Sequence, residues 1–310
     1  MEEAKSSKKV RQKFLTAEIE HLIETNRLAI QARSMSASKR GIGRTSIVVV
    51  CMDGRTHQAE TALGLDKTTT VRFASGGGKI ELNDFLRLHA PLLTNDGSRV
   101  TILLTTHEVV GYPNLGCAAF NCDMPEQRRY FTALRQSLAQ RLPEAWIHAV
   151  SHDTSTDGLW AIELDQRNEA FVELVKSGGK PLPKTQPNKA HGEYGIYVGD
   201  QLHAWVAGYN TYFHISSAAP SLRGDLDIAL SVMLHHSKVD LSNKPIVLLL
   251  DRPTGDDPVS TEQYNQARIM TEDFLRSSKV TELMESGRIR LVELETNPTT
   301  WSGRVVTTID

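Results

Sequence analysis

Residues 47–55 read IVVVCMDGR, a run of four β-branched residues that leads directly into Cys51. Such a run predicts a buried strand of a parallel sheet, because branched side chains suit a pleated surface that is covered on both faces. Cys51 would then end the strand at the edge where open α/β sheets bind ligands. Asp53 and Arg55 follow at alternate positions, so in an extended chain their side chains point to the same side as Cys51.

A second apolar run, residues 100–106, ends at His107, and a loop rich in Gly, Pro and Asn then leads to Cys117. Two thiolates and an imidazole form a zinc-binding set, and three protein ligands leave the fourth position open for water or substrate. The alternative is that the cysteines are packed as small hydrophobic residues. Cys122 is a second candidate for the third ligand. We favour Cys117, because it is nearer to the strand end and precedes a segment, 118–120, that suits the start of a packed helix.

Taken together, residues 51–55, the strand that ends in His107, and Cys117 resemble the β-class carbonic anhydrases. Residues 71–77 are similar to the Arg-Asn-Ala-Gly-Gly segment of that family, and residues 146–160 to its late strand and turn. The resemblance covers residues 45–162. Nine residues separate His107 from Cys117, where the usual family pattern has two, and the longer loop resembles the carboxysomal shell branch.

This resemblance implies a zinc enzyme that reversibly hydrates carbon dioxide to bicarbonate. It implies Cys51, His107 and Cys117 as metal ligands, Asp53 and Arg55 as a catalytic pair, and assembly into a homo-oligomer. One alternative is a zinc hydrolase of a similar linear molecule, carbon disulfide or carbonyl sulfide. The other is a non-catalytic, zinc-stabilised assembly or shell-binding protein. The acid–base pair argues against the latter, because a structural zinc site needs neither residue and usually has four protein ligands.

Composition restricts the kinds of partner that we expect. The formal net charge is −2, which implies no general attraction to nucleic acid or to an anionic membrane. Three cysteines indicate thiols kept reduced or bound to metal. The sequence also shows no secretory signal and no apolar run of about 18 residues, so we expect a cytoplasmic protein without a membrane span. Residence in a carboxysome-type microcompartment, in contact with its shell, is a further expectation from the resemblance.

Along the chain we expect three parts. Residues 1–44 form an N-terminal arm with a helix over 14–32, which would pack on the catalytic lobe or on a partner chain. Residues 45–175 form the zinc-binding lobe, with a strand over 69–73, helices over 82–93 and 124–142, and a late strand from 146 to 150. A linker rich in Gly, Pro and Lys, residues 176–188, leads to a second lobe, residues 189–310.

The second lobe repeats the first in outline. Residues 101–111 align with 245–255 at an offset of 245 − 101 = 144, and residues 71–76 align with 213–218 at 213 − 71 = 142. In this alignment His107 corresponds to Asp251, and no cysteine follows Cys122. We therefore predict an α/β protein of two duplicated lobes, each a mainly parallel sheet flanked by helices, with one metal site per chain and a second lobe without metal ligands.

Overall fold

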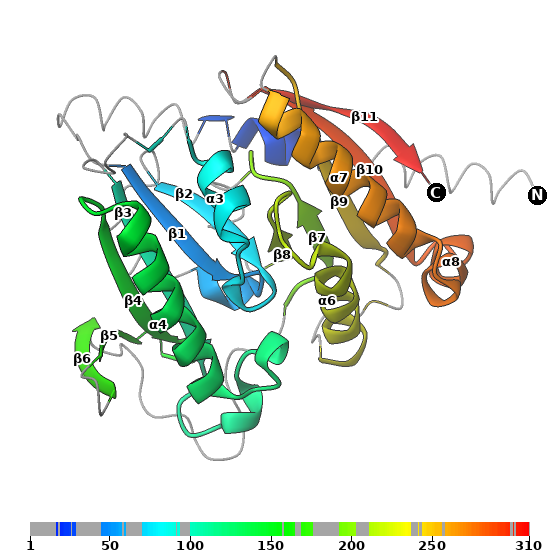
Figure 1. Ribbon diagram of the computed structural model, residues 1–310. Coiled ribbons are helices and arrows are strands. Elements are labelled where there is room, and N and C mark those ends of the chain that lie inside the picture. The colour runs from blue at the N-terminus through cyan, green and yellow to red at the C-terminus, as the bar shows by residue number, and fades with distance from the viewer. Residues whose placement is uncertain are drawn as a thin grey trace, which may run out of the picture.

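The structure is a computed structural model in which two sheets lie next to each other, with helices packed against them (Figure 1). It describes residues 17–28 without 18 and 26, 45–59 without 58, 70–93 without 91, 100–164 without 157, 169–175, 192–202, 211–236, 241, 244–255, 258–300 without 298 and 299, and 302–309. The expected linker at 176–188 lies outside these residues. Among them, no helix has the length and apolar character that crossing a bilayer requires.

The first sheet has six strands in the order β2-β1-β3-β4-β5-β6. Its strands are β1 (Thr45–Cys51), β2 (Thr70–Ser75), β3 (Val100–Glu108), β4 (Trp146–Asp153), β5 (Gly158–Leu164) and β6 (Glu169–Val175). The first four are parallel, while β5 and β6 add antiparallel pairs at the edge. The predicted strands are thus confirmed, and β2 and β4 continue two and three residues beyond their expected ends.

The helices of this lobe follow local sequence signals. They are η1 (Gly54–His57), η2 (Gly76–Gly78), α3 (Leu82–Leu88), η3 (Pro113–Leu115), η4 (Ala118–Phe120) and α4 (Met124–Arg141). The Asp123 side chain caps α4 by accepting from the Glu126 N–H, which satisfies a free donor of the first turn. The predicted α4 is confirmed. The helix expected over 82–93 ends at Leu88, shortly before Pro91, which disfavours helix in the residue before it.

The second sheet has the order β11-β10-β9-β7-β8, which repeats the order β5-β4-β3-β1-β2 of the first. Its elements are β7 (Gly195–Val198), β8 (Tyr212–Ile215), α6 (Leu222–His236), β9 (Ile246–Pro253), α7 (Pro258–Leu275), α8 (Ser278–Glu285), β10 (Ile289–Thr296) and β11 (Gly303–Ile309). As in the first sheet, the central pairs are parallel and the outer pair is antiparallel. The chain is therefore an α/β protein of two duplicated lobes, as predicted.

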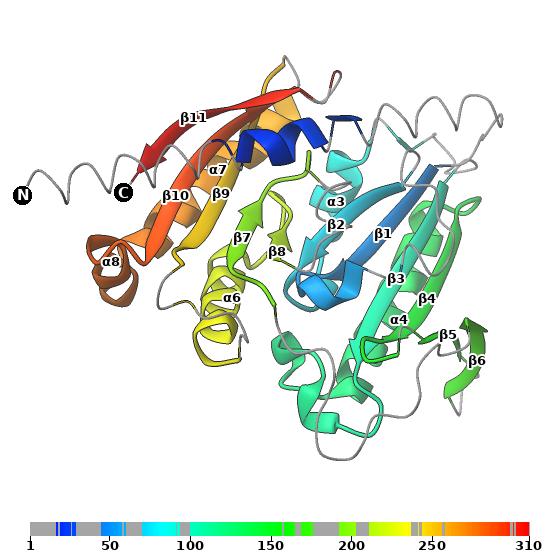
Figure 2. The same cartoon turned by 180° about the vertical axis from the view of Figure 1, so that it is seen from behind.

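The lobes meet through β2 and β8, which lie side by side in Figures 1 and 2. The Ala74 N–H donates to Ser216 Oγ at 2.9 Å, and the Ser216 N–H donates to the Ala74 carbonyl at 2.7 Å. These two residues differ by 216 − 74 = 142, the offset predicted for this segment. Counterparts meet in this way next to a two-fold axis, so β2 and β8 are equivalent strands about a pseudo-two-fold.

The register of the neighbouring strands tests the two predicted offsets together. The residues level with one another across three strands are Phe73, Val49 and Leu104 in the first sheet and Ile215, Val198 and Leu250 in the second. Between β2 and β8 the offset is 215 − 73 = 142, as predicted. Between β3 and β9 it is then 250 − 104 = 146, where the prediction was 144. The two predicted offsets therefore do not hold together. With β2 and β8 matched at 142, Asp251 corresponds to Thr105, whereas with the strand ends Cys51 and Val198 matched it corresponds to His107, as predicted. A shift of two leaves every side chain on its own face, so apolar patterning cannot detect it.

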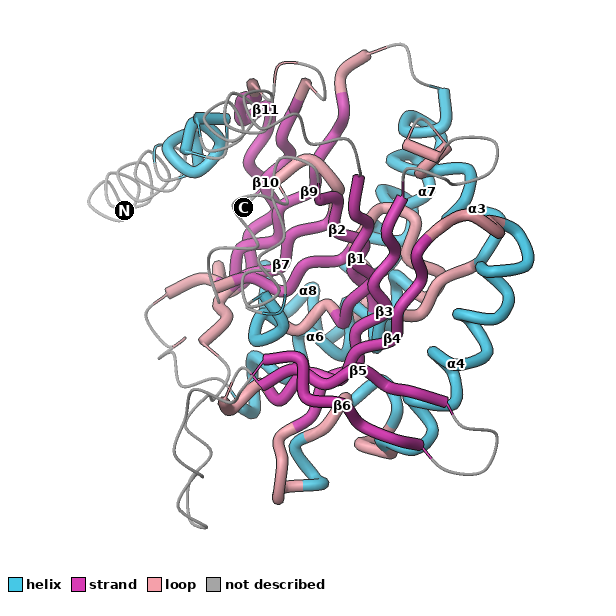
Figure 3. The backbone as a smooth tube through the Cα atoms, turned by 90° about the vertical axis from the view of Figure 1, so that its left-hand side faces the viewer, coloured by secondary structure: helices cyan, strands magenta, loops and turns pink. Residues whose placement is uncertain are grey.

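Residues 17–28 contain the predicted N-terminal helix, and it packs on the second lobe rather than on the first. Ile19 and Ile23 are almost fully buried against one face of the second sheet. The residues of that apolar cluster are Tyr197, Leu202, Tyr212, Val247, Leu249, Val292 and Leu294. Figure 3 shows this helix on one side of the strands and α3, α4 and α7 on the other. The helix therefore covers a sheet face that would otherwise expose apolar side chains.

Candidate metal centre

The three predicted zinc ligands lie together at the carboxyl edge of the first sheet. Cys51 is the last residue of β1, His107 is near the end of the adjacent parallel strand β3, and Cys117 directly precedes η4. Their ligand atoms all lie within 4.8 Å of one another, and all three residues are buried. Neighbouring parallel strands end at the same edge, so their terminal side chains meet there.

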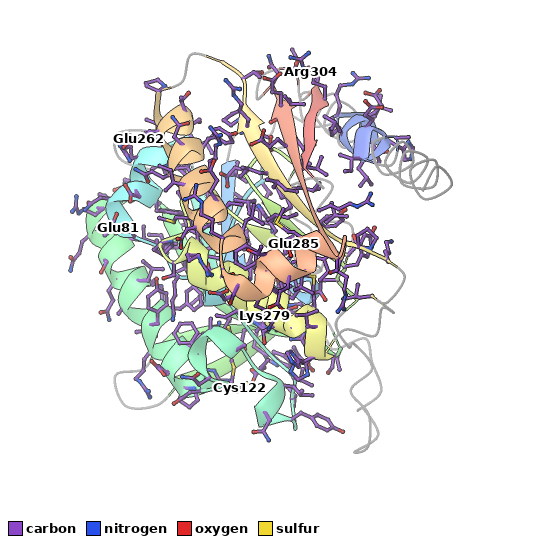
Figure 4. All side chains as sticks on the ribbon, turned by 90° about the vertical axis from the view of Figure 1, so that its right-hand side faces the viewer. Glu81, Cys122, Glu262, Lys279, Glu285 and Arg304 are labelled. Atoms are coloured by element: carbon purple, nitrogen blue, oxygen red, sulfur yellow. The ribbon has the colours of Figure 1, made fainter. Side chains whose placement is uncertain are left out.

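The backbone conformation of the turn before α4 determines which of the two candidate cysteines, Cys117 or Cys122, faces Cys51 and His107. Asn121 and Cys122 both have left-handed backbone conformations, with φ of 50° and 61°, and the Cys122 N–H returns to the Cys117 carbonyl at 2.9 Å. Cys122 is thereby directed away from the sheet, and its thiol donates to the Asn114 carbonyl at 3.4 Å. The residue is labelled in Figure 4 on the segment that leads into α4. Cys117 therefore completes the group, although the helix expected to follow it is a single 3₁₀ turn.

The geometry of the group fits a zinc ion. Two sulfur ligands about 2.3 Å from a tetrahedral zinc lie about 3.8 Å apart, and Cys51 Sγ and Cys117 Sγ are separated by 3.8 Å. Neither ring nitrogen of His107 has a hydrogen-bond partner of proper geometry among the described residues, so both are free to serve as ligand atoms. The buried sulfurs also differ in acidity. The contact between the two sulfur atoms lowers the pKa of Cys51, while the same contact and burial raise the pKa of Cys117.

Asp53 and Arg55 form a buried ion pair beside Cys51. The Arg55 Nη2–Asp53 Oδ2 distance is 2.6 Å, and Arg55 Nε lies 3.0 Å from Asp53 Oδ1. Burial opposes the charge on Arg55, but Asp53, with help from Glu193 and Cys51, more than offsets burial and raises the pKa of the guanidinium. The extended segment expected here is wrong: residues 54–57 form the 3₁₀ turn η1. The Arg55 N–H also donates to Asp53 Oδ1 at 2.9 Å, so the turn itself brings the two side chains together.

Two residues to which the sequence assigned no individual role stabilise this turn. Thr56 Oγ1 lies 2.8 Å from the Asp53 carbonyl and 3.1 Å from the Cys51 carbonyl, so its hydroxyl closes the turn after β1. Arg72 of β2 is 1% exposed and donates to Thr56 Oγ1 at 2.7 Å. One feature of the sequence signals this role, namely an arginine inside a predicted strand. A buried charge needs hydrogen-bonding or ionic partners, so Arg72 had to contact polar groups nearby.

The second lobe supplies much of the wall around the centre. A cavity of about 40 Å³ adjoins Cys51, His107 and the Asp53–Arg55 pair, and Phe213, Ile228 and Val232 of the second lobe form part of its wall. The fully buried Glu193, which precedes β7, accepts from the Gly54 N–H at 3.0 Å and helps to raise the pKa of Arg55. The sequence did not predict these second-lobe residues as part of the site. They are far along the chain from the proposed ligands, and nothing in their local sequence indicates that they share a cavity with them.

His89, which the sequence places in a helix, is a structural residue. It caps α3, its Nδ1 lies 2.8 Å from the Phe85 carbonyl, and its ring packs against Phe73 and Phe85. Burial lowers its pKa to about 4, although the bond to Phe85 opposes the shift. It therefore stays neutral at physiological pH and has no place in the metal centre.

Comparison with known proteins adds one structural likeness. No protein-family model matches the sequence, and no curated protein is significantly similar to it. One solved structure that is similar is β-carbonic anhydrase isoform I of the protozoan Trichomonas vaginalis. It is 15% identical, the match covers 43% of this chain and 94% of that one, and the TM-score is 0.24. At this level of similarity the metal centre rests on the residues of this chain alone.

Proposed function

We propose that the chain is a zinc-dependent enzyme that reversibly hydrates carbon dioxide to bicarbonate. The observation that carries the proposal is the buried Cys51, His107 and Cys117 group, with ligand atoms within 4.8 Å, next to the Asp53–Arg55 pair. The same residues carry the sequence resemblance to β-class carbonic anhydrases. The proposal thus unites a ligand set with an acid–base pair that a purely structural site does not need.

In this proposal the chain's own residues have distinct tasks. Bound zinc would act as a Lewis acid that lowers the pKa of a coordinated water toward neutrality. Asp53 would accept a hydrogen bond from that water and orient it. Arg55 holds the carboxylate with a fork of hydrogen bonds at 2.6 to 3.1 Å, which keeps it ionised and away from the metal's open position.

The cavity supports a very small substrate. Its volume of about 40 Å³ suits a molecule of a few atoms. Phe213, Ile228 and Val232 give it an apolar wall, which suits an uncharged molecule such as carbon dioxide. Carbon disulfide and carbonyl sulfide share that shape, so both belong in the assay as competing substrates.

A non-catalytic zinc site is the alternative of a different class. Structural zinc sites almost always have four protein ligands, whereas the group found among the described residues contains three. Assembly into a homo-oligomer and contact with a microcompartment shell are proposals that stand on the sequence resemblance.

The test combines metal analysis with a carbon dioxide hydration assay on the purified chain. We expect about one zinc per chain and rapid hydration. Cys117→Ser should lose zinc and activity, while Cys122→Ser, the matched control, should keep both. Zinc loss in Cys122→Ser with full zinc in Cys117→Ser would overturn the ligand set. Full zinc without hydration, or with turnover of only the sulfur analogues, would overturn the proposed reaction.

A further inference from the structure

A glycine turn of the first lobe lies between Cys51 and the second lobe. This turn, η2 (Gly76–Gly78), follows β2, and its Gly77 N–H donates to Cys51 Sγ at 3.3 Å. The preceding N–H, that of Gly76, donates to Asp225 Oδ2 at 2.9 Å. Asp225 belongs to α6 of the second lobe and is 4% exposed. Two consecutive peptide N–H groups therefore connect a second-lobe carboxylate to a first-lobe sulfur.

The turn is packed too tightly to move without its neighbours. A Cβ atom on Gly76 would lie 2.2 Å from Asp225 Oδ1, and one on Gly77 would lie 2.5 Å from the Phe120 ring. Gly77 and Gly78 have φ of 71° and 72°, a conformation that side chains disfavour. The carboxylate of Asp225 thus lies directly against the Gly76 backbone, and the N–H of the next residue, Gly77, points at Cys51 Sγ.

We propose that Asp225 is a positioning residue for the zinc centre, which holds the Gly76–Gly77 turn so that the Gly77 N–H stays on Cys51 Sγ. The inference rests on the proposed zinc site. A hydrogen bond to a ligating sulfur orients the ligand and withdraws part of its charge, so such outer contacts tune metal affinity. The second lobe has no metal ligands of its own among the described residues, and this contact is a reason for the chain to retain it.

Hydrogen bonding, rather than charge, is the property that this role requires. Burial raises the pKa of Asp225 to about 6, and the Gly76 N–H and Lys79 partly offset that shift. An asparagine at this position keeps an acceptor oxygen for the Gly76 N–H but removes the charge. Alanine removes the acceptor altogether. The two substitutions therefore separate the two properties.

The experiment uses the full chain with cobalt(II) in place of zinc, because thiolate-to-cobalt charge-transfer bands report on the sulfur ligands. In Asp225→Ala we expect a shifted charge-transfer band and cobalt affinity lower by about 10- to 100-fold. Asp225→Asn should restore both to near the parent values. Gly76→Ala should reproduce the alanine effect, because its Cβ displaces the carboxylate. Asp227→Ala is the control, since Asp227 lies on the same helix with its side chain 55% exposed.

The outcomes distinguish this inference from the proposed function. A parent chain that takes up no cobalt would overturn the zinc site and this role together. A parent that binds cobalt, with an unchanged band and affinity in Asp225→Ala, would overturn only the role of Asp225. An Asp225→Asn variant as impaired as the alanine variant would also overturn it, because charge would then be the active property. If Asp225→Ala does not fold, the asparagine and Gly76→Ala variants decide.

Discussion

Asp53 and Arg55 show how a turn of four residues can create a chemical unit. The carboxylate receives three hydrogen bonds from the Arg55 guanidinium and a fourth from the Arg55 backbone N–H. A bare carboxylate two residues from a zinc ligand would compete for the metal, since oxygen ligands also suit zinc. The guanidinium satisfies that carboxylate instead, so each residue depends on the other for its role.

We therefore expect Asp53→Ala and Arg55→Ala each to reduce hydration by about 10²-fold or more while zinc stays bound. The double variant should cost little beyond the worse single variant, because residues that act as one unit are not additive. The measurement is the hydration rate with the zinc content of each purified variant. Near-normal activity in Asp53→Ala, or rate losses that multiply, would contradict this and favour a non-catalytic site.

The N-terminal helix shows how an element can be predicted correctly and placed wrongly. Its apolar stripe is local information, and it predicts a helix with one buried face. The surface that accepts the stripe is formed by β7, β9 and β10, far along the chain. Figure 2 shows the helix running across those strands. Its contribution to stability should therefore depend on the side chains that face the second sheet.

Ile23 is 2% exposed and Leu28 is 51% exposed on the same helix, so they form a matched pair. We expect Ile23→Ala to lower the free energy of unfolding by about 2 to 4 kcal/mol, through lost burial and the cavity it leaves. Leu28→Ala should change it by less than about 0.5 kcal/mol. Urea unfolding of both variants measures this. Equal effects would show that the helix does not pack on the second sheet.

At the scale of the molecule, one apolar core belongs to both lobes. Cys51, Met52, Cys117 and Phe120 of the first lobe share a buried cluster with residues of α6, β7 and β9. The proposed zinc ligands Cys51 and Cys117 are thus part of the packing between the lobes. The hydrogen bonds between Ala74 and Ser216 and the contact of Asp225 with Gly76 join the same region.

This continuity predicts that both lobes unfold together and that metal removal destabilises both. Zinc at about a thousand times its dissociation constant adds about 4 kcal/mol to the free energy of unfolding. Because the unfolding entropy grows with chain length, its removal from a chain of 310 residues should lower Tm by roughly 6 °C. Differential scanning calorimetry of the zinc-loaded and chelated chain should show a single transition in each state. Two transitions, of which a chelator shifts only one, would show that the lobes are independent.

Much of the fold and the ligand set could be derived from the sequence, because these features are local. A β-branched run predicts its own burial, and the ends of such runs predict which residues share a sheet edge. Cys51 and His107 were placed by this argument. The helix Met124–Arg141 was predicted from its own periodicity, and the duplication from matched runs that are buried in the same way.

Tertiary structure alone decided how distant parts meet. The left-handed conformation at Asn121 and Cys122 sets which cysteine faces the sheet. Asparagine adopts that conformation readily, but a cysteine does so only where its surroundings hold it. The difference of two residues between the offsets of neighbouring strands is invisible to an apolar pattern with a period of two. Glu193 and Asp225 reach the centre because the lobes pack about a pseudo-two-fold. Such contacts depend on the position of residues in space, which local propensity and periodicity do not contain.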